Sequence, residues 1–389
     1  MWDTDPRQPW LRGERPDHVV QHDEELGTWN VHGYPEVAEI LADWGRFSSD
    51  TTRLFPAMDR SVTDGNILQL DPPEHRQLRR LVSHAFTPKV VADLEPRITA
   101  LTGELLDDVA EDDFELVRDL AYPLPVIVIA ELLGVPSSDR DLFKLWVDKM
   151  FEDTGPLSLN NDEATQREEL RDRVEVMRPL LDYLAAHAAD CRRTPRPGLL
   201  NDLVRAEVDG ERLSDAQVVN FASILLVAGH LTTTMLLGNT VLCLDANPDQ
   251  LAAVRRDRAL IPAAIEESLR FLTPFAAVAR VTNGPQVIAG VEVPGDRMLM
   301  LWLGAANRDP RRFANPDVLD ITREPNAHLG FGRGAHFCLG APLARLEGRL
   351  ALDVLLDRFP RLRTDPDRRP TFIASPELTG VQTLPLLTG

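Results

Sequence analysis

The sequence predicts a mainly α-helical fold with small β-sheets, because one very long apolar helix and two further helices stand beside only short strand-like segments. Ser214-Asp215-Ala216-Gln217 is a capping-box sequence, and an almost unbroken apolar stretch follows it as far as Asn247-Pro248. That length predicts one helix of roughly thirty residues, far above the ~11–12-residue mean. Apolar residues lie on nearly all of its faces, so we expect this helix to run through the protein interior.

The other predicted elements are shorter. One helix is expected over 262–271, with Pro262 near its start, and another over 341–358, ending before Pro360. The cluster at 194–198 predicts a turn between helices. Because we find no repeat, low-complexity tract or linker, we expect a single domain over residues 1–389. Strand-like segments are expected at 29–31, 277–282, 286–293 and 297–301.

Composition and charge argue against several kinds of protein. The net charge of -19 argues against binding along nucleic acid or an anionic membrane surface. The polar N-terminus predicts no signal peptide, and the apolar runs are too short to predict a membrane span, so we expect a cytoplasmic protein. The three cysteines are too few for a disulfide framework and lack the close pairing of a zinc site. Cys191 and Cys243 are expected to be small core residues.

The glycine-rich segment 328–340 is the most informative part of the chain, since Cys338 near its end directly precedes a predicted helix. Gly332 and Gly334 permit tight or left-handed turns, which lets backbone approach a flat partner closely. A helix N-terminus favours a thiolate at Cys338, and a thiolate so placed is a strong axial ligand for haem iron. The alternative from these residues alone is a glycine loop with an incidental buried cysteine.

The pattern Phe331-x-x-Gly334-x-x-x-Cys338-x-Gly340 resembles the haem-binding sequence of the cytochrome P450 family. The resemblance covers roughly residues 20–387 and is closest to the soluble bacterial (class I) members. It implies the cytochrome P450 fold, a helix-rich triangular prism with small sheets. It also implies haem b (iron protoporphyrin IX) with Cys338 as the iron ligand, and Phe331, Gly332 and Gly340 as further haem-binding residues.

A second segment, Glu267-Ser268-Leu269-Arg270, matches the Glu-x-x-Arg pattern of that family. The i, i+3 spacing places Glu267 and Arg270 on one helical face, and alone such a pair is usually a surface ion pair. The resemblance implies instead a buried structural pair that binds a later arginine and supports the cysteine loop. The candidates for that arginine are Arg308, Arg311, Arg312 and Arg323.

Four basic residues from three distant segments match the family's partners of the haem propionates: His75, Arg79, Arg280 and His336. Alone, His75 and Arg79 at i, i+4 would form one solvated helical face. Two buried carboxylates need charged hydrogen-bond donors, because an unpaired buried charge is very costly. The resemblance therefore implies that these four side chains bind the haem.

On the long helix, Ala228 and Gly229 remove side-chain bulk and are expected to leave room for dioxygen. Thr232 follows Ala228 by one turn and lies on the same side. A helical threonine commonly bonds back to a carbonyl, but the resemblance implies that Thr232 guides protons to dioxygen, with Thr233 beside it.

The family usually has an acidic residue where this chain has Leu231, and leucine cannot relay a proton. Protons would then arrive through water chains at Thr232 and Thr233, or from His230 or the substrate. We expect His230 to be a packed helix histidine.

The implied activity is that of a monooxygenase, in which one oxygen atom of O2 enters the substrate. Hydroxylation is the first expected outcome, and epoxidation is the second. The resemblance indicates further pocket walls from 52–67 and 151–175. The individual residues implied for the pocket are largely apolar and suit a sizeable apolar substrate, and the resemblance implies a polyketide, macrolide or terpenoid of secondary metabolism. Two alternatives remain open, namely a substrate tethered to a carrier protein and a haem-based binding or sensing module without turnover. The resemblance implies that the pocket is lined by Ile224, Val227, Ala228, Phe275, Ala276, Ala277, Leu378 and Thr379.

No reductase domain is present, so the resemblance implies electrons from a ferredoxin served by an NAD(P)H-dependent ferredoxin reductase. A local basic patch on the cysteine-loop face is predicted to guide the ferredoxin despite the negative total charge. A monomer is expected from the family. The arginines of this patch are Arg76, Arg79, Arg80, Arg333, Arg345 and Arg349.

Overall fold

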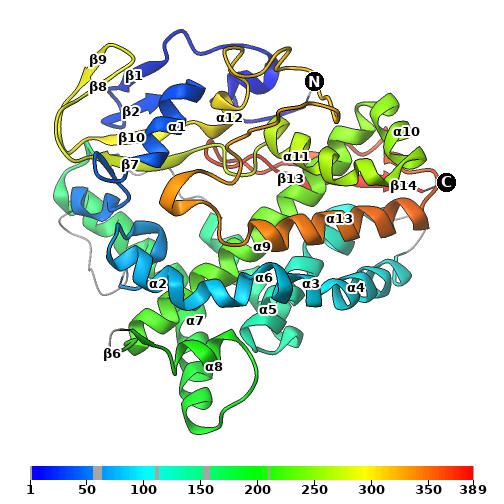
Figure 1. Cartoon of the computed structure of the whole chain (residues 1–389), viewed down its shortest axis with the longest axis horizontal. Helices are drawn as coiled ribbons and strands as arrows, with labels where there is room; N and C mark the ends of the chain where they lie inside the picture. Colours follow the sequence, from blue (N-terminus) through cyan, green and yellow to red (C-terminus); the bar gives the residue numbers. More distant parts are fainter. Residues whose placement is uncertain (1, 56–63, 110–113, 152–157, 209–210, 389) are drawn as a thin grey trace.

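The structure is a computed structural model that describes residues 2–55, 64–109, 114–151, 158–208 and 211–388. Helix α9 (Asp215–Asp245) crosses the middle of the molecule (Figure 1) and has 31 residues, close to the predicted length. Ser214 accepts a hydrogen bond from the backbone N–H of Gln217, whose side chain accepts one from the backbone N–H of Ser214, so the predicted capping box is confirmed. By length and composition α9 could cross a membrane, but 61% of its most apolar window is buried inside the protein, as in a core helix.

Other helices surround α9 (Figure 1). The predicted helix ends are confirmed to within one residue for α11 and at both ends for α13, and the turn predicted at 194–198 joins α7 to α8. The helices are α1 (Tyr34–Ala42), α2 (Glu74–Ser83), α3 (Pro88–Asp93), α4 (Glu95–Asp107), α5 (Pro123–Leu133), α6 (Arg140–Phe151), α7 (Glu163–Arg193), α8 (Leu199–Leu203), α10 (Pro248–Arg256), α11 (Ile261–Phe271), α12 (Leu303–Ala306) and α13 (Ala341–Arg358).

A five-stranded sheet lies to one side of the helices, in the order β1-β2-β10-β7-β3. Strands β2 and β10 run parallel, and the other neighbours are antiparallel. Arg280 of β7 pairs in register with Leu299 of β10, so the sheet determines where this arginine emerges. The strands are β1 (Val20–Asp23), β2 (Thr28–Val31), β3 (Phe47–Ser48), β7 (Val278–Thr282) and β10 (Met298–Leu301).

The single strand predicted over 286–293 is wrong. The segment forms a hairpin of β8 (Gln286–Ile288) and β9 (Val291–Val293). Ala289 and Gly290 both take positive φ angles, 48° and 80°, which reverses the chain between the strands. The smaller sheets contain β4 (Phe114–Glu115), β11 (Arg363–Thr364) and β14 (Pro385–Leu387), then β12 (Thr371–Phe372) with β13 (Val381–Thr383), and β5 (Glu207–Val208) with β6 (Glu211–Arg212).

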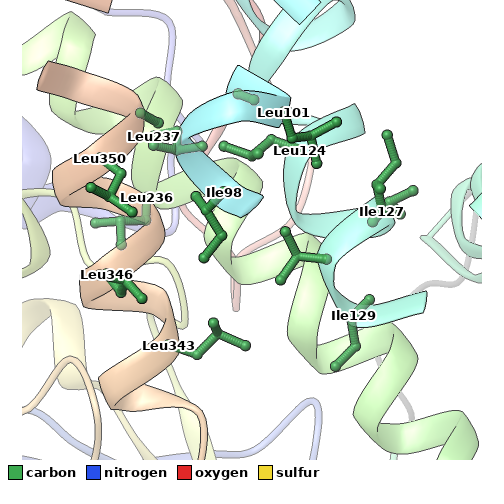
Figure 2. Close-up of a cluster of buried hydrophobic side chains, with 14 of the residues drawn as sticks. Ile98, Leu101, Leu124, Ile127, Ile129, Leu236, Leu237, Leu343, Leu346 and Leu350 are labelled. Atoms are coloured by element: carbon green, nitrogen blue, oxygen red, sulfur yellow. The ribbon is translucent and has the colours of Figure 1, made fainter. Parts of the chain in front are cut away.

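The main hydrophobic core binds α13 to its neighbours. Figure 2 shows Leu343, Leu346 and Leu350 of α13 directed towards Ile98 of α4 and Leu236 of α9. Burial of each such side chain contributes roughly 1.5–3 kcal/mol. Because α13 begins three residues after Cys338, this packing sets the position of the cysteine loop relative to α9.

Candidate active site

The cysteine loop turns tightly before α13. The backbone N–H of Cys338 donates to the carbonyl oxygen of Phe331 at 2.9 Å. Gly332 and Gly334 both take positive φ, 68° and 73°, as the sequence predicted. A Cβ atom on Gly334 would lie 2.6 Å from the carbonyl oxygen of Leu41, so glycine is required there for the loop to lie against α1.

The surroundings of Cys338 act on its thiol in two directions. Burial raises the pKa of Cys338, while the backbone N–H groups of Gly340 and Ala341 and the guanidinium groups of Arg79 and Arg345 lower it. The net change is upward, so the helix N-terminus alone does not produce the expected thiolate. A bound metal ion deprotonates a coordinating thiol, and Cys338 retains some accessible surface for such a contact.

Glu267 and Arg270 form a fully buried ion pair, with N···O distances of 2.7 and 2.8 Å. Arg323 is the third member, since its Nε lies 3.2 Å from a carboxylate oxygen of Glu267. Arg270 also donates to the carbonyl oxygen of Asn307, whose side-chain oxygen accepts the backbone N–H of Leu329 at the beginning of the cysteine loop. The pair therefore supports the loop structurally.

The structure brings together the four basic residues predicted from three segments. The rings of His75 and His336 lie 4.1 Å apart between centroids. Arg79 donates to the carbonyl oxygens of Ala335 and Phe337 in the cysteine loop. Burial, followed by the charges of Arg280, His75 and Arg79, lowers the pKa of His336 to about 3.

This cluster suits a buried anion. Arg280 is 8% exposed, and burial lowers its pKa to about 10, opposed by the charge of Asp71. Within the described residues, neither Arg79 nor Arg280 forms a salt bridge, and neither ring nitrogen of His75 has a hydrogen-bond partner. Asp71 is the nearby carboxylate, but it forms no ion pair with either arginine in the described residues. These donors therefore fit the two propionates of a haem, because each propionate needs charged donors when buried.

One face of α9 is partly exposed although most of the helix is buried. The residues of this open face are Ile224, Val227, Ala228, Leu231 and Thr232. Their i, i+3, i+4, i+7, i+8 spacing indicates a space along a single side of the helix. Gly229 is also partly exposed, and a Cβ atom there would lie 2.9 Å from Ile129 of α5. Its missing side chain lets α5 approach α9.

The two threonines make the same local bond. The Thr232 hydroxyl donates to the carbonyl oxygen of Ala228, and the Thr233 hydroxyl donates to that of Gly229 at 3.1 Å. Thr233 is 3% exposed, whereas Thr232 lies on the open face. His230 is fully buried and its ring lies edge-on to Tyr122, as expected for a packed histidine, and it also lines the cavity described below.

A cavity of about 1860 Å³ adjoins α9, β7 and β10. Of the predicted pocket residues, Phe275, Ala277 and Leu378 line this cavity. Ala276 instead packs with Trp10 and Ala305, and Thr379 donates to Gln8. Ile224, Val227 and Ala228 belong to the open face of α9 and do not line the cavity.

The predicted walls at 52–67 and 151–175 are described only in part. Phe55 and Arg173 line the cavity, while 56–63 and 152–157 lie outside the described residues. Sequence reasoning missed Met298, Met300 and Trp302, which line the cavity from β10 and the residue after it. Their period-2 alternation with the buried Leu299 and Leu301 could have identified this wall.

Comparisons with known proteins agree with this geometry. The family model for cytochrome P450 matches residues 22–387. The chain is 43% identical to cyclomarin C epoxidase CymV of Salinispora arenicola, over 91% of this chain and 89% of that protein. It is 42% identical to erythromycin C-12 hydroxylase of Saccharopolyspora erythraea, over 98% and 94%.

Solved structures show the same fold. The structure of HmtN, a post-tailoring hydroxylase involved in himastatin biosynthesis, has a TM-score of 0.89 and 55% identity, covering 100% of this chain and 98% of that one. Haem is the family's cofactor, and the anion-binding cluster and the loop ending at Cys338 both suit it. The helix-rich fold, the cysteine loop and the match along nearly the whole sequence show that the chain belongs to the cytochrome P450 family of monooxygenases.

Proposed function

We propose that this enzyme inserts one oxygen atom of O2 into a sizeable secondary metabolite, with Cys338 as the iron ligand. The convergence of His75, Arg79, Arg280 and His336 beside the cysteine loop is the observation that supports this most strongly. When bound, the haem supplies the oxygen chemistry, and the protein supplies orientation and protons. Hydroxylation is the first expected outcome and epoxidation the second.

Different residues of the chain bind the haem and deliver protons. The four basic side chains bind and orient the propionates, while Phe331, Gly332 and Gly340 form the haem-facing surface around Cys338. The Thr232 hydroxyl donates its hydrogen to the carbonyl oxygen of Ala228. Its oxygen can therefore accept a hydrogen bond from the group that delivers protons, and so hold that group in place. Ala228 leaves space on the same face of α9, and Thr233 lies beside it as a weaker candidate for the proton route.

The cavity favours a large substrate. Its volume of about 1860 Å³ exceeds the ~300–1,000 Å³ of common ligand pockets. Phe275, Ala277 and Leu378 provide apolar contacts, and two relatives are named for cyclomarin C and erythromycin. A polyketide, macrolide or other secondary metabolite of similar size is the substrate class that we propose.

The first test is a titration of the ferric holoprotein with macrolides, other polyketides, terpenoids and carrier-bound acids. A productive ligand displaces water from the iron and converts low-spin to high-spin haem. A saturable shift with a macrolide or polyketide, followed by product with a surrogate ferredoxin, is expected. Binding without any product would support the sensing alternative, and a Cys338→Ser variant that keeps the thiolate spectrum would refute the proposed ligand.

We further propose that a ferredoxin, reduced by an NAD(P)H-dependent reductase, binds over the cysteine loop. A surface groove of about 450 Å³ between α1, α2 and the loop includes Trp44, Arg76 and Arg80. The basic patch is narrower than predicted from the sequence, because Arg345 and Arg349 are paired with Glu266 and Glu95. We propose, finally, that the enzyme is cytoplasmic and monomeric and that residues 1–389 form one domain.

A further inference from the structure

Glu266 is adjacent to Glu267 on α11 but has different partners. Arg345 of α13 donates to both of its carboxylate oxygens, with N···O distances of 2.7 and 2.8 Å. His328 Nε2 lies 3.1 Å from the same carboxylate. Burial raises the pKa of Glu266, but the bonds from Arg345 and His328 outweigh it and lower that pKa to about 2. Glu266 is therefore a carboxylate at neutral pH.

The first arm of this arrangement runs through His328. The backbone N–H of Gly330 donates to His328 Nδ1 at 3.0 Å, so Nδ1 carries no proton. The proton of the neutral ring is then on Nε2, which donates to Glu266. The His328 side chain is 3% exposed. Glu266 thus orients a buried ring that in turn binds the backbone of the cysteine loop.

The second arm runs through Arg345. Its guanidinium carbon lies 4.5 Å from the centroid of the Phe331 ring, a cation–π contact. The carbonyl oxygen of Phe331 accepts the backbone N–H of Cys338. Both arms therefore end on the residues that precede Cys338 in the loop.

We propose that Glu266 is a positioning residue for Cys338, holding the cysteine loop through His328 and Arg345 and offsetting the positive charge of Arg345. This second clamp is separate from the Glu267 network, which reaches the loop through Asn307. The inference rests on the proposed role of Cys338 as the iron ligand. Its effect falls on the geometry and electrostatics of that ligand rather than on the substrate.

The chain offers a matched control one helical turn later on α13. Arg349 donates to Glu95 of α4 at 2.7 Å, and its side chain is 38% exposed, compared with 39% for Arg345. Within the described residues, Glu95 makes no hydrogen bond or ion pair with the cysteine loop. Removing this ion pair measures how much the loss of any ion pair between α13 and a neighbouring helix affects haem retention when the cysteine loop keeps its contacts.

Three holoenzyme variants separate charge from geometry. Glu266→Gln removes the negative charge and one of the two hydrogen bonds that Glu266 accepts from Arg345. Arg345→Lys keeps the positive charge but cannot form both bonds at once. Glu95→Gln is the control. The measurements are the rate of haem transfer to an excess of apomyoglobin, the thiolate share of the ferrous carbon monoxide spectrum, and the reduction potential. None of these readouts requires turnover.

Glu266→Gln and Arg345→Lys are each expected to speed haem release about tenfold, as for loss of one charge-assisted hydrogen bond. Glu266→Gln alone should raise the reduction potential, because the uncompensated charge of Arg345 favours the added electron. Haem release from Glu266→Gln as slow as from Glu95→Gln overturns the proposal. If Glu266→Gln does not fold, wild-type release from Arg345→Lys overturns it equally. If Cys338 is not the iron ligand, the Cys338→Ser variant shows this separately, because it keeps the thiolate spectrum.

Discussion

The Thr232 hydroxyl donates to the carbonyl oxygen of Ala228, one turn earlier on α9, with an O···O distance of 2.9 Å. This bond uses the only proton of the hydroxyl, so its oxygen faces the open side of the helix as an acceptor. Thr233 makes the equivalent bond on a buried face. The structure therefore distinguishes two threonines that the sequence could not rank by chemistry.

Thr232→Val should lower product formation by about tenfold or more and increase the share of electrons lost as peroxide, because the acceptor oxygen is removed without changing side-chain shape. Thr240→Val is the matched control, since Thr240 is buried and donates to Leu236 in the same way two turns later. Product and peroxide are measured per NAD(P)H consumed. Equal coupling in the two variants would show that the Thr232 hydroxyl has no part in proton delivery.

Leu231→Glu should change the proton route, since Leu231 is partly exposed and lines the cavity. A carboxylate there can relay protons where leucine cannot, so we expect less peroxide per product. Leu231→Gln has similar size and polarity but no exchangeable carboxyl proton, and it should resemble the wild type. Unchanged product rate and peroxide in Leu231→Glu would mean that position 231 is irrelevant to proton delivery.

Arg323→Gln should destabilise the protein by about 3 kcal/mol, because it leaves the buried Glu267 with one fewer cationic partner. The exposed Arg312 came from the same set of candidates but contacts the ring of Tyr34 instead. Arg312→Gln should therefore cost less than about 0.5 kcal/mol. Denaturant unfolding of both variants checks this, and similar losses would argue against a special role for Arg323.

The stability of the protein should depend on Glu347, which is 1% exposed and whose pKa burial raises from 4.5 to about 8. Between these values the folded state holds a proton that the unfolded state has released. Stability should then fall as pH rises, by about 1.4 kcal/mol per pH unit from this group.

Glu347→Gln removes this dependence, so it should match the wild type near pH 4.5 and be more stable than it at pH 8. Denaturant unfolding of both proteins at several pH values measures the difference. A stability difference that does not grow between these pH values would show that Glu347 ionises normally in the folded protein.

Arg333→Glu should slow reduction by a ferredoxin at low salt, because Arg333 is exposed on the cysteine loop. Arg76→Glu in the neighbouring groove should act in the same direction. Arg171→Glu on α7 is the control, being 73% exposed on another element. In stopped-flow measurements, the reduction rates of the variants and the wild type should converge as ionic strength rises. Identical reduction rates at low salt would exclude this surface as the docking site.

The sequence by itself determined the features that depend on local chemistry. A capping box marked the start of α9, Pro262 marked the start of α11, Pro360 marked the end of α13, and a glycine loop before a helix identified Cys338. These signals act within a few residues, so they can be interpreted without knowing the rest of the fold. The same reasoning failed at Ala289, because an alanine with positive φ has no local signal.

Only the tertiary structure decided which residues meet across segments. Arg308, Arg311, Arg312 and Arg323 have the same chemistry, yet only Arg323 reaches Glu267. Gly229 was expected to leave room for dioxygen, and the structure adds a contact that no local pattern indicated, since a Cβ atom there would lie 2.9 Å from Ile129 of α5. Glu266, next to the predicted pair, was not singled out at all. Pairings of this kind depend on how whole helices pack, and packing is set by side chains far apart in the chain, which no local pattern records.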